Sequence, residues 1–270
     1  MKTALGFLLL LALAIPVLSA AEPPMSVFVV HCEPTNANEI LWGELVSLVS
    51  LADQHGVPLT IDFTAQWAEM ILGDEAKLAL LEAWLAAGHE IAGHHHPYWT
   101  LQQRSATWDG YTNTPLDEIL LQDRALYRGT MDAYMALLNA LPGERRSGCF
   151  GLSDERDYAD WPCRLVYATV GHTLDEAVST PYERSFQDCD LLEISHALIV
   201  EPPRGALRAL FEETDPDSVF GVVGHVYNYA EFSAVFEQWF TFLAEIDSDG
   251  LRRTTVSGLL DAYEDGEPGD

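Results

Sequence analysis

The sequence has little positive charge, and this shortage limits what the protein can bind. Only 14 lysine and arginine residues stand against 42 aspartate and glutamate residues, which gives a formal net charge of -28 over 270 residues. Such a field repels phosphate backbones and anionic lipid headgroups over about a Debye length. We therefore expect no nucleic acid among its partners. The acidic residues form a solubilising surface or, alternatively, adapt the protein to saline surroundings, where salt screens their repulsion.

Long apolar runs are also missing, apart from one at the start of the chain. Residues 1–21 combine a lysine, an apolar stretch interrupted by Pro16, and small residues at the end. This pattern is typical of a secretory signal peptide. No later segment approaches the roughly 18 consecutive apolar residues that a membrane helix needs. We expect residues 22–270 to form a single domain, secreted or periplasmic, with no stable membrane insertion after cleavage.

Cysteine is scarce, with residues at positions 32, 149, 163 and 189. Disulfides persist in the compartments to which exported proteins go, and four cysteines allow three complete pairings. We predict a bond between Cys149 and Cys163, because these residues enclose a short acidic loop that a bond of that span stabilises by roughly 3 kcal/mol. Cys32 lies in a different context, the segment His31-Cys32-Glu33 at the end of a predicted strand.

The sequence contains no Gly-rich phosphate loop, no Gly-x-Ser-x-Gly elbow and no internal repeat, so nucleotide hydrolysis and α/β-hydrolase chemistry lose their usual support. It does show strands alternating with helices. We predict strands at 25–31, 59–63, 89–92, 165–171, 190–199 and 219–227, and helices at 38–54, 74–87, 115–140, 204–213 and 230–246. This alternation, without a linker, predicts parallel βαβ units in a barrel-like α/β fold.

Histidines gather where the predicted strands end. The first strand runs into His31-Cys32-Glu33, a later one into three consecutive histidines at 94–96, and the last into Gly224-His225. The carboxyl ends of the strands form the active face of an α/β barrel. Histidines with one carboxylate are a ligand set that suits zinc. The pattern predicts a divalent metal site at this face.

The spacing of the three consecutive histidines indicates which of them converge. Pro97 favours an extended backbone at His96, and alternate side chains of an extended segment share a face. We expect His94 and His96 to meet at one ion while His95 points elsewhere.

Residues 88–94, Gly-His-Glu-Ile-Ala-Gly-His, resemble the second motif of the polysaccharide deacetylases, also called the NodB-homology or carbohydrate esterase family 4 proteins. The resemblance covers most of the chain after residue 21, with further support from the acidic end of the first strand, the segment at 56–63 and the late histidine at 225. It implies a distorted (β/α)7 barrel that holds one divalent metal ion, zinc, through an acid and two histidines. It also implies removal of acetyl groups from amino sugars or sugar hydroxyls.

The resemblance assigns roles to individual residues. Glu33 matches the acidic metal ligand and His94 the first ligand histidine. The family's second ligand histidine lies four residues further on, where this chain has Tyr98, so we place His96 in that role. His225 matches the late histidine that acts as general acid.

The position of the general base is altered. Where the family has an aspartate, this chain has His31 or Cys32, depending on how the motifs are matched. We assign His31, because an imidazole with a pKa near 6.5 is a competent base at neutral pH. Asp62 and Asp109 are spare acids for the same role. As a fourth metal ligand, His31 would instead close the site and make the metal structural.

Three further residues are assigned to substrate binding. Arg145 or Arg146 falls near an arginine-containing loop of the family, and we assign Arg146. Tyr98 and Trp99 are aromatic residues that can stack against a sugar ring.

The first functional hypothesis is an exported, metal-dependent deacetylase-like hydrolase of a carbohydrate or another acylated small molecule. The second is a protein that binds a glycan or a metal on the same barrel without hydrolysis.

Overall fold

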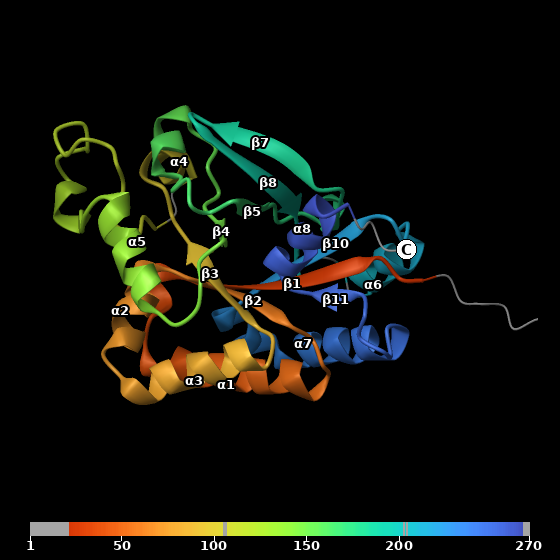
Figure 1. The fold of residues 1–270 in the computed structure, drawn as a ribbon. Coiled ribbons are helices and arrows are strands. Elements are labelled where there is room, and N and C mark those ends of the chain that lie inside the picture. Colours follow the sequence, from red (N-terminus) through yellow and green to blue (C-terminus); the bar gives the residue numbers. More distant parts are fainter. Residues whose placement is uncertain (1–21, 105–106, 202, 204, 267–270) are drawn as a thin grey trace, which may run out of the picture.

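The computed structural model of the protein describes residues 22–104, 107–201, 203 and 205–266. The predicted signal peptide at 1–21 lies outside these residues. In the part described, one sheet has the strand order β6-β10-β1-β2-β3-β4-β5-β8-β7, with β9 beside β10 and β11 beside β1 (Figure 1). The strands are β1 Met25–Cys32, β2 Leu59–Phe63, β3 Glu90–His94, β4 Ser147–Cys149, β5 Tyr167–Val170, β6 Val178–Ser179, β7 Tyr182–Phe186, β8 Cys189–Ser195, β9 Ala197–Leu198, β10 Val219–His225 and β11 Arg253–Thr254.

The central path of this sheet is parallel at every pairing, from β10 through β1, β2, β3, β4 and β5 to β8. β6 and β7 add antiparallel edges to it. The path curls into an incomplete barrel, which confirms the predicted distorted (β/α) barrel. Buried runs rich in valine form β1 and β10, as expected for parallel strands that are covered on both faces.

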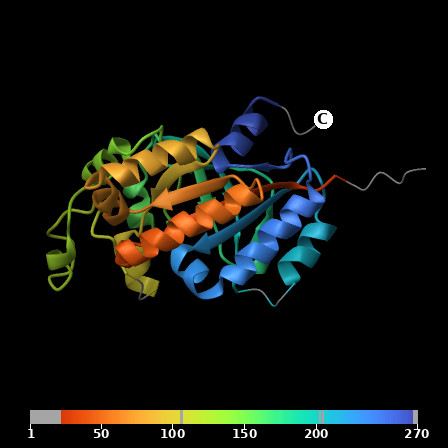
Figure 2. The same cartoon turned by 90° about the horizontal axis from the view of Figure 1, so that it is seen from below.

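Helices surround the curled sheet, and α1 and α7 lie side by side along it (Figure 2). Asn38 begins α1 by accepting hydrogen bonds from the backbone N–H groups of Ile40 and Leu41, the usual role of an N-cap. The helices are α1 Glu39–Gln54, α2 Ala65–Leu72, α3 Glu75–Ala86, α4 Tyr98–Arg104, α5 Met131–Ala140, α6 Ala206–Glu213, α7 Val226–Ile246 and α8 Val256–Glu264, with 3-10 turns η1 Pro34–Asn36, η2 Arg124–Leu126, η3 Glu155–Asp160 and η4 Leu174–Ala177.

The predicted helix at 115–140 is wrong over its first half. Only α5 is an α-helix there, and η2 with several turns precedes it. Leu116, Leu121 and Leu126 of this segment are about half or more exposed, at 48%, 79% and 58%. The segment therefore lacks the packed apolar face that stabilises most helices in proteins.

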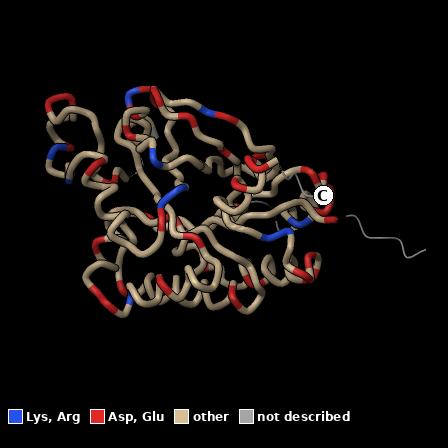
Figure 3. Tube along the Cα trace, in the orientation of Figure 1, with Lys and Arg blue, Asp and Glu red and all other residues tan. Residues whose placement is uncertain are grey.

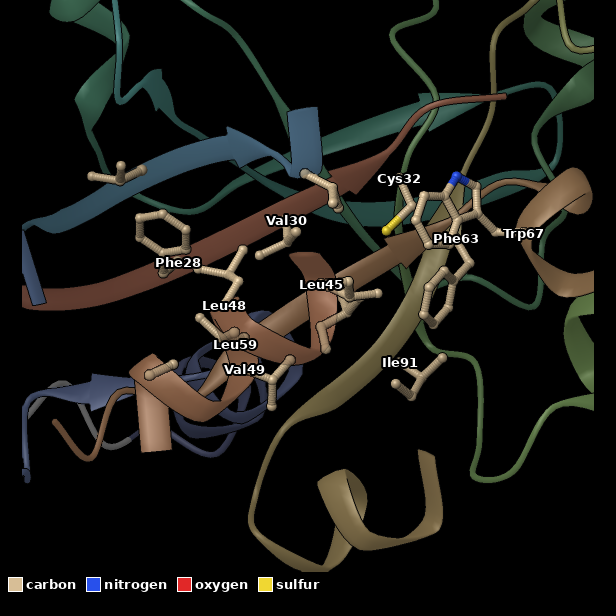
Figure 4. Packing of buried hydrophobic residues seen from close by; sticks show 14 of the residues in the cluster. Phe28, Val30, Cys32, Leu45, Leu48, Val49, Leu59, Phe63, Trp67 and Ile91 are labelled. Atoms are coloured by element: carbon tan, nitrogen blue, oxygen red, sulfur yellow. The ribbon is translucent and has the colours of Figure 1, made fainter. Parts of the chain in front are cut away.

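The alternation of β1 side chains separates a core from the barrel interior. Phe28, Val30 and Cys32 point toward α1, where they pack near Leu45 and Leu48 (Figure 4). Complete burial of a phenylalanine or leucine side chain contributes roughly 1.5–3 kcal/mol. The intervening residues of β1 face the barrel interior, where Val27 and Val29 form a second apolar cluster. His31 continues this second row and therefore points to the inside of the barrel.

The predicted Cys149–Cys163 bond is wrong, because Cys163 is bonded to Cys189. The Cα atoms of this pair are 5.1 Å apart, which suits a disulfide. Cys149 is buried in β4 as a free thiol, and Cys32 is also free and buried. The bond ties the loop before β5 to the start of β8.

Acidic residues are spread along most of the described chain and outnumber the basic ones (Figure 3). Across the described residues, none of the helices is both long enough and apolar enough to cross a bilayer.

Candidate metal centre

The histidines predicted at strand ends meet at one edge of the sheet. In the parallel register, His31 of β1 pairs with His225 of β10 on one side and with Asp62 of β2 on the other. His94 ends β3, and Glu33 follows β1 directly. The Trp67 indole N–H donates to the Glu33 carbonyl oxygen at 2.9 Å and so fixes the backbone at that position.

The Glu33 carboxylate lies among three imidazoles. Its Oε2 is 2.9 Å from His96 Nε2, and its Oε1 is 3.2 Å from His225 Nε2 and 3.4 Å from His94 Nε2. Burial raises the pKa of Glu33, but hydrogen bonds from these three rings outweigh burial and hold the pKa well below its usual range. Glu33 is therefore an anion at the mouth of the barrel.

The Nδ1 atoms of the same three histidines are held by oxygen acceptors. His94 Nδ1 lies 3.0 Å from the Cys149 carbonyl oxygen and His96 Nδ1 lies 2.7 Å from that of Thr107. His225 Nδ1 is 2.9 Å from Asn228 Oδ1, which also accepts the His225 backbone N–H. A carbonyl oxygen only accepts, so each Nδ1 carries the proton. A neutral ring then presents an Nε2 lone pair to the Glu33 side, and a protonated ring donates an Nε2–H hydrogen bond to Glu33.

This arrangement brings two lone pairs into close opposition. His94 Nε2 and His96 Nε2 are 3.0 Å apart. Two neutral acceptors at that distance repel each other unless a proton or a metal cation lies between them. Burial lowers the pKa of His94 although Glu33 opposes it, whereas at His96 the effect of Glu33 outweighs burial and raises the pKa. His96 is therefore the ring that takes a proton when no metal is present.

Glu33, His94 and His96 fit a divalent metal ion. Each offers one ligand atom, and these atoms all lie within 4.8 Å of one another. Two imidazole nitrogens and a carboxylate oxygen suit zinc, and the Nδ1–H···O=C hydrogen bonds behind both rings are the usual support for ligand histidines. The structure thus places together the three residues assigned as ligands from the sequence.

His95 points away from this group, as the alternation of an extended segment requires. Its Nδ1 is 2.8 Å from Asp109 Oδ2, and its Nε2 is 3.5 Å from Asp160 Oδ2. Although burial lowers its pKa, these two carboxylates raise it to about 10. Asp109 also accepts the backbone N–H of His96 at 3.1 Å. Asp109, a spare acid in the sequence, therefore holds the histidine segment and does not face the site.

His31 stacks on His94, with ring centroids 4.1 Å apart, and is 1% exposed. Burial, together with the neighbouring histidines, lowers its pKa well below the usual range, so its ring is neutral. Its Nε2 lies 3.6 Å from Asp62 Oδ2. Burial raises the pKa of Asp62. Cys32, the alternative to His31 in the base position, packs in the core on the opposite face of β1.

Two residues assigned to substrate binding lie elsewhere. Arg146 precedes β4 and so lies at the amino end of the strands, opposite the histidines, where it forms an ion pair with Asp261 at 2.6 Å. Tyr98 is fully buried, and its hydroxyl donates to Asp123 at 2.9 Å. Both assignments are therefore corrected, because these side chains are committed to other contacts. Trp99 is half-buried under Arg156, whose guanidinium carbon lies 3.9 Å from the ring centroid.

The sequence reasoning missed two residues that contact this centre. Asn228 anchors His225 from the first turn of α7. His172 follows β5, and its ring is parallel to that of His225 within 15°, with centroids 6.5 Å apart. His172 carries the signal that identified the other histidines, a position just after a buried strand, but no motif surrounds it.

No protein-family model and no curated protein sequence matches this chain. Solved structures do match its fold. A protein assigned as a polysaccharide deacetylase from Mycobacterium smegmatis has a TM-score of 0.56 at 12% identity, over 92% of this chain and 96% of that one. Another from Pseudomonas aeruginosa PAO1 has a TM-score of 0.53 at 16% identity, over 91% and 92% of the two chains.

A third similar structure is the 4-alpha-glucanotransferase from Thermococcus litoralis, with a TM-score of 0.51 at 11% identity, over 87% of this chain and 38% of that one. The fold is therefore that of the polysaccharide deacetylases, in a divergent form, and the resemblance noted in the sequence is confirmed at this level.

Proposed function

We propose that the protein is an exported, metal-dependent deacetylase-like hydrolase that removes acetyl groups, bound through nitrogen or oxygen, from a carbohydrate. The observation that carries this proposal is the convergence of Glu33, His94 and His96, with two Nε2 lone pairs 3.0 Å apart. The polysaccharide deacetylase fold and the motif at 88–94 support the substrate class.

Glu33, His94 and His96 would hold one zinc ion at the mouth of the barrel. Three protein ligands leave a coordination position open, which distinguishes a catalytic zinc site from a structural one. When bound, zinc supplies Lewis acidity, which lowers the pKa of a bound water and polarises an acyl carbonyl. The residues around it then supply orientation and proton transfer.

His31 is assigned as the general base. Its ring is neutral, so it has a lone pair with which to accept a proton. Its stacking on His94 keeps the ring beside the ligand group and fixes its orientation. The low exposure of His31 excludes bulk water, so a proton taken up there is not exchanged freely with solvent.

His225 is assigned as the general acid. Its Nδ1 proton is held by Asn228, so Nε2 is the atom that gains and releases a proton. Nε2 lies 3.2 Å from Glu33 Oε1, next to the ligand group and on the far side of β1 from His94. From this place it can donate to a leaving amine or alkoxide.

Export is proposed from residues 1–21 and from the disulfide between Cys163 and Cys189. Disulfides of this kind persist in the periplasm and outside the cell and are rare in the cytosol. The strong negative charge favours a neutral or basic substrate, such as a glycan with free or acetylated amino groups, over a phosphorylated one.

Release of acetate from acetylated chito-oligosaccharides and from a simple acetyl ester tests this proposal. We expect hydrolysis that a chelator abolishes and zinc restores. His225→Gln should retain zinc and lose activity on the order of 100-fold or more, because a general acid typically contributes that much. If the zinc-loaded protein releases no acetate from either substrate class, the hydrolase is rejected, and the non-hydrolytic binding protein becomes the better hypothesis.

A further inference from the structure

A second group of histidines lies beside the proposed zinc ligands and shares none of them. His31, His172 and His225 come from the ends of β1, β5 and β10. One ring nitrogen of each lies within 4.8 Å of one ring nitrogen of the other two. The His31 centroid is 5.3 Å from that of His225 and 6.5 Å from that of His172.

The backbone around His172 is fixed, although the side chain is exposed at the mouth of the barrel. Its N–H donates to Glu176 Oε2 at 2.8 Å, and its carbonyl oxygen accepts the Leu198 N–H at 2.9 Å. Gly171, with φ of +103°, allows the turn that brings His172 over the barrel. A Cβ at this glycine would lie 2.9 Å from the His196 carbonyl oxygen. These contacts fix the backbone that carries the exposed His172 side chain.

The rings of this second group have nitrogens to offer. His31 Nε2 has no hydrogen-bond partner among the described residues, and the His172 side chain is exposed. His225 presents Nε2 because Nδ1 is bonded to Asn228. Three imidazoles at the ends of neighbouring strands form a zinc ligand set.

Glu33 connects the two groups. Its Oε2 faces His96, in the first group, and its Oε1 is 3.2 Å from His225, in the second. A carboxylate between two sets of ligands is favourable for two cations, because its charge offsets part of their mutual repulsion. Two-ion sites in which neighbouring cations share one pocket occur in several classes of hydrolase.

We propose that His31, His172 and His225 form a second divalent-cation site next to the Glu33, His94 and His96 site. Zinc is the cation that three imidazoles suit best. One consequence rests on the proposed function: an ion on His31 and His225 occupies the base and the acid, so excess zinc inhibits hydrolysis. The second site thereby links activity to the local zinc concentration.

Zinc titration of the purified, chelator-stripped protein by calorimetry tests the proposal, with metal content measured after dialysis. We expect two binding events in the parent, and a single event in His172→Ala. His55→Ala, at the far end of α1, is the matched control and should keep both events. His172→Gln replaces the alanine variant if thermal unfolding shows that the latter is not folded. In the His172 variant that lacks the second binding event, excess zinc should no longer inhibit acetate release.

Saturation of the parent at one zinc ion per chain would overturn the second site, as would two unchanged events in both His172 variants. These outcomes are distinct from failure of the proposed function. Two bound ions without any acetate release would retain the second site and reject the hydrolase. Acetate release with one bound ion would retain the hydrolase and reject the second site.

Discussion

Removal of the disulfide should destabilise the protein by an amount that follows from its span. Cys163 and Cys189 are separated by 26 residues. The chain-entropy relation gives about 3–4 kcal/mol at 25 °C for a loop of that length. Cys189 is 7% exposed, so serine fits the space with little change in packing. The variant with both Cys163→Ser and Cys189→Ser should therefore lose about 3–4 kcal/mol of unfolding free energy.

Equilibrium unfolding in urea is the appropriate assay. With a slope of about 2–3 kcal/mol per molar urea, the midpoint should fall by about 1–2 M. A reductant should lower the stability of the parent to that of the double variant and leave the variant unchanged. Peptide mapping of the unreduced protein should recover Cys163 linked to Cys189, with Cys32 and Cys149 as free thiols. Equal midpoints for parent and variant, or recovery of Cys149 in a bonded peptide, would refute this reasoning.

Three further predictions address the site and the strands that build it. Asn228→Leu removes the acceptor that orients His225 and should lower acetate release on the order of 100-fold at unchanged zinc content; equal kinetics would exclude the orienting role. Although burial raises its pKa, hydrogen bonds lower the pKa of Glu176 to about 2, so its stabilisation is complete above about pH 4.5 and is lost as the pH falls toward 2. Glu176→Gln should lower the unfolding free energy at pH 7 by about 1 kcal/mol after allowance for solvent screening. Its unfolding free energy should also fall less than that of the parent as the pH is lowered from 4.5 to 2. Urea midpoints that fall equally in the variant and the parent over this pH range would contradict this. Gly221→Ala places a Cβ atom against the Ser195 carbonyl oxygen of the neighbouring chain segment and should destabilise β10 by about 3 kcal/mol or more; a thermal midpoint equal to that of the parent would show that the strand can shift.

The parallel strands were predictable because each is buried on both faces and reads as a continuous apolar run. β1, β2 and β10 are examples, and their predicted bounds are within two residues of the structure. The prediction of a helix from Pro115 onward was wrong up to residue 130, because a proline suited to a first helical turn does not supply a buried face. Leu116 and Leu121 are 48% and 79% exposed, so neither packs against the core.

The site was predictable where local backbone geometry decides the outcome. Pro97 and the alternation of an extended segment are enough to bring His94 and His96 together, and the structure has them 3.0 Å apart at Nε2. The role of Arg146 depended on whether it lies at the amino or the carboxyl end of β4. This strand has three residues, which are too few to show a recognisable pattern in the sequence.

Long-range pairings were the least predictable part. The short spacing favours a bond from Cys163 to Cys149, but spacing along the chain does not show which cysteine side chains face each other in the fold. Cys149 is held in β4 beside His94. His172 lies near the other histidines only because β5 is a strand of the same curled sheet. Such contacts depend on the completed barrel and not on any local pattern.

The affinity for the first equivalent of zinc is the most direct test of the central claim that Glu33, His94 and His96 hold a metal ion. It can be measured by competition with a chromophoric chelator, with at most one equivalent of zinc per chain. We predict tight binding in the parent and in the His55→Ala control, and loss of that binding in Glu33→Ala, His94→Ala and His96→Ala. Equal competition by the parent and these three variants would contradict the account.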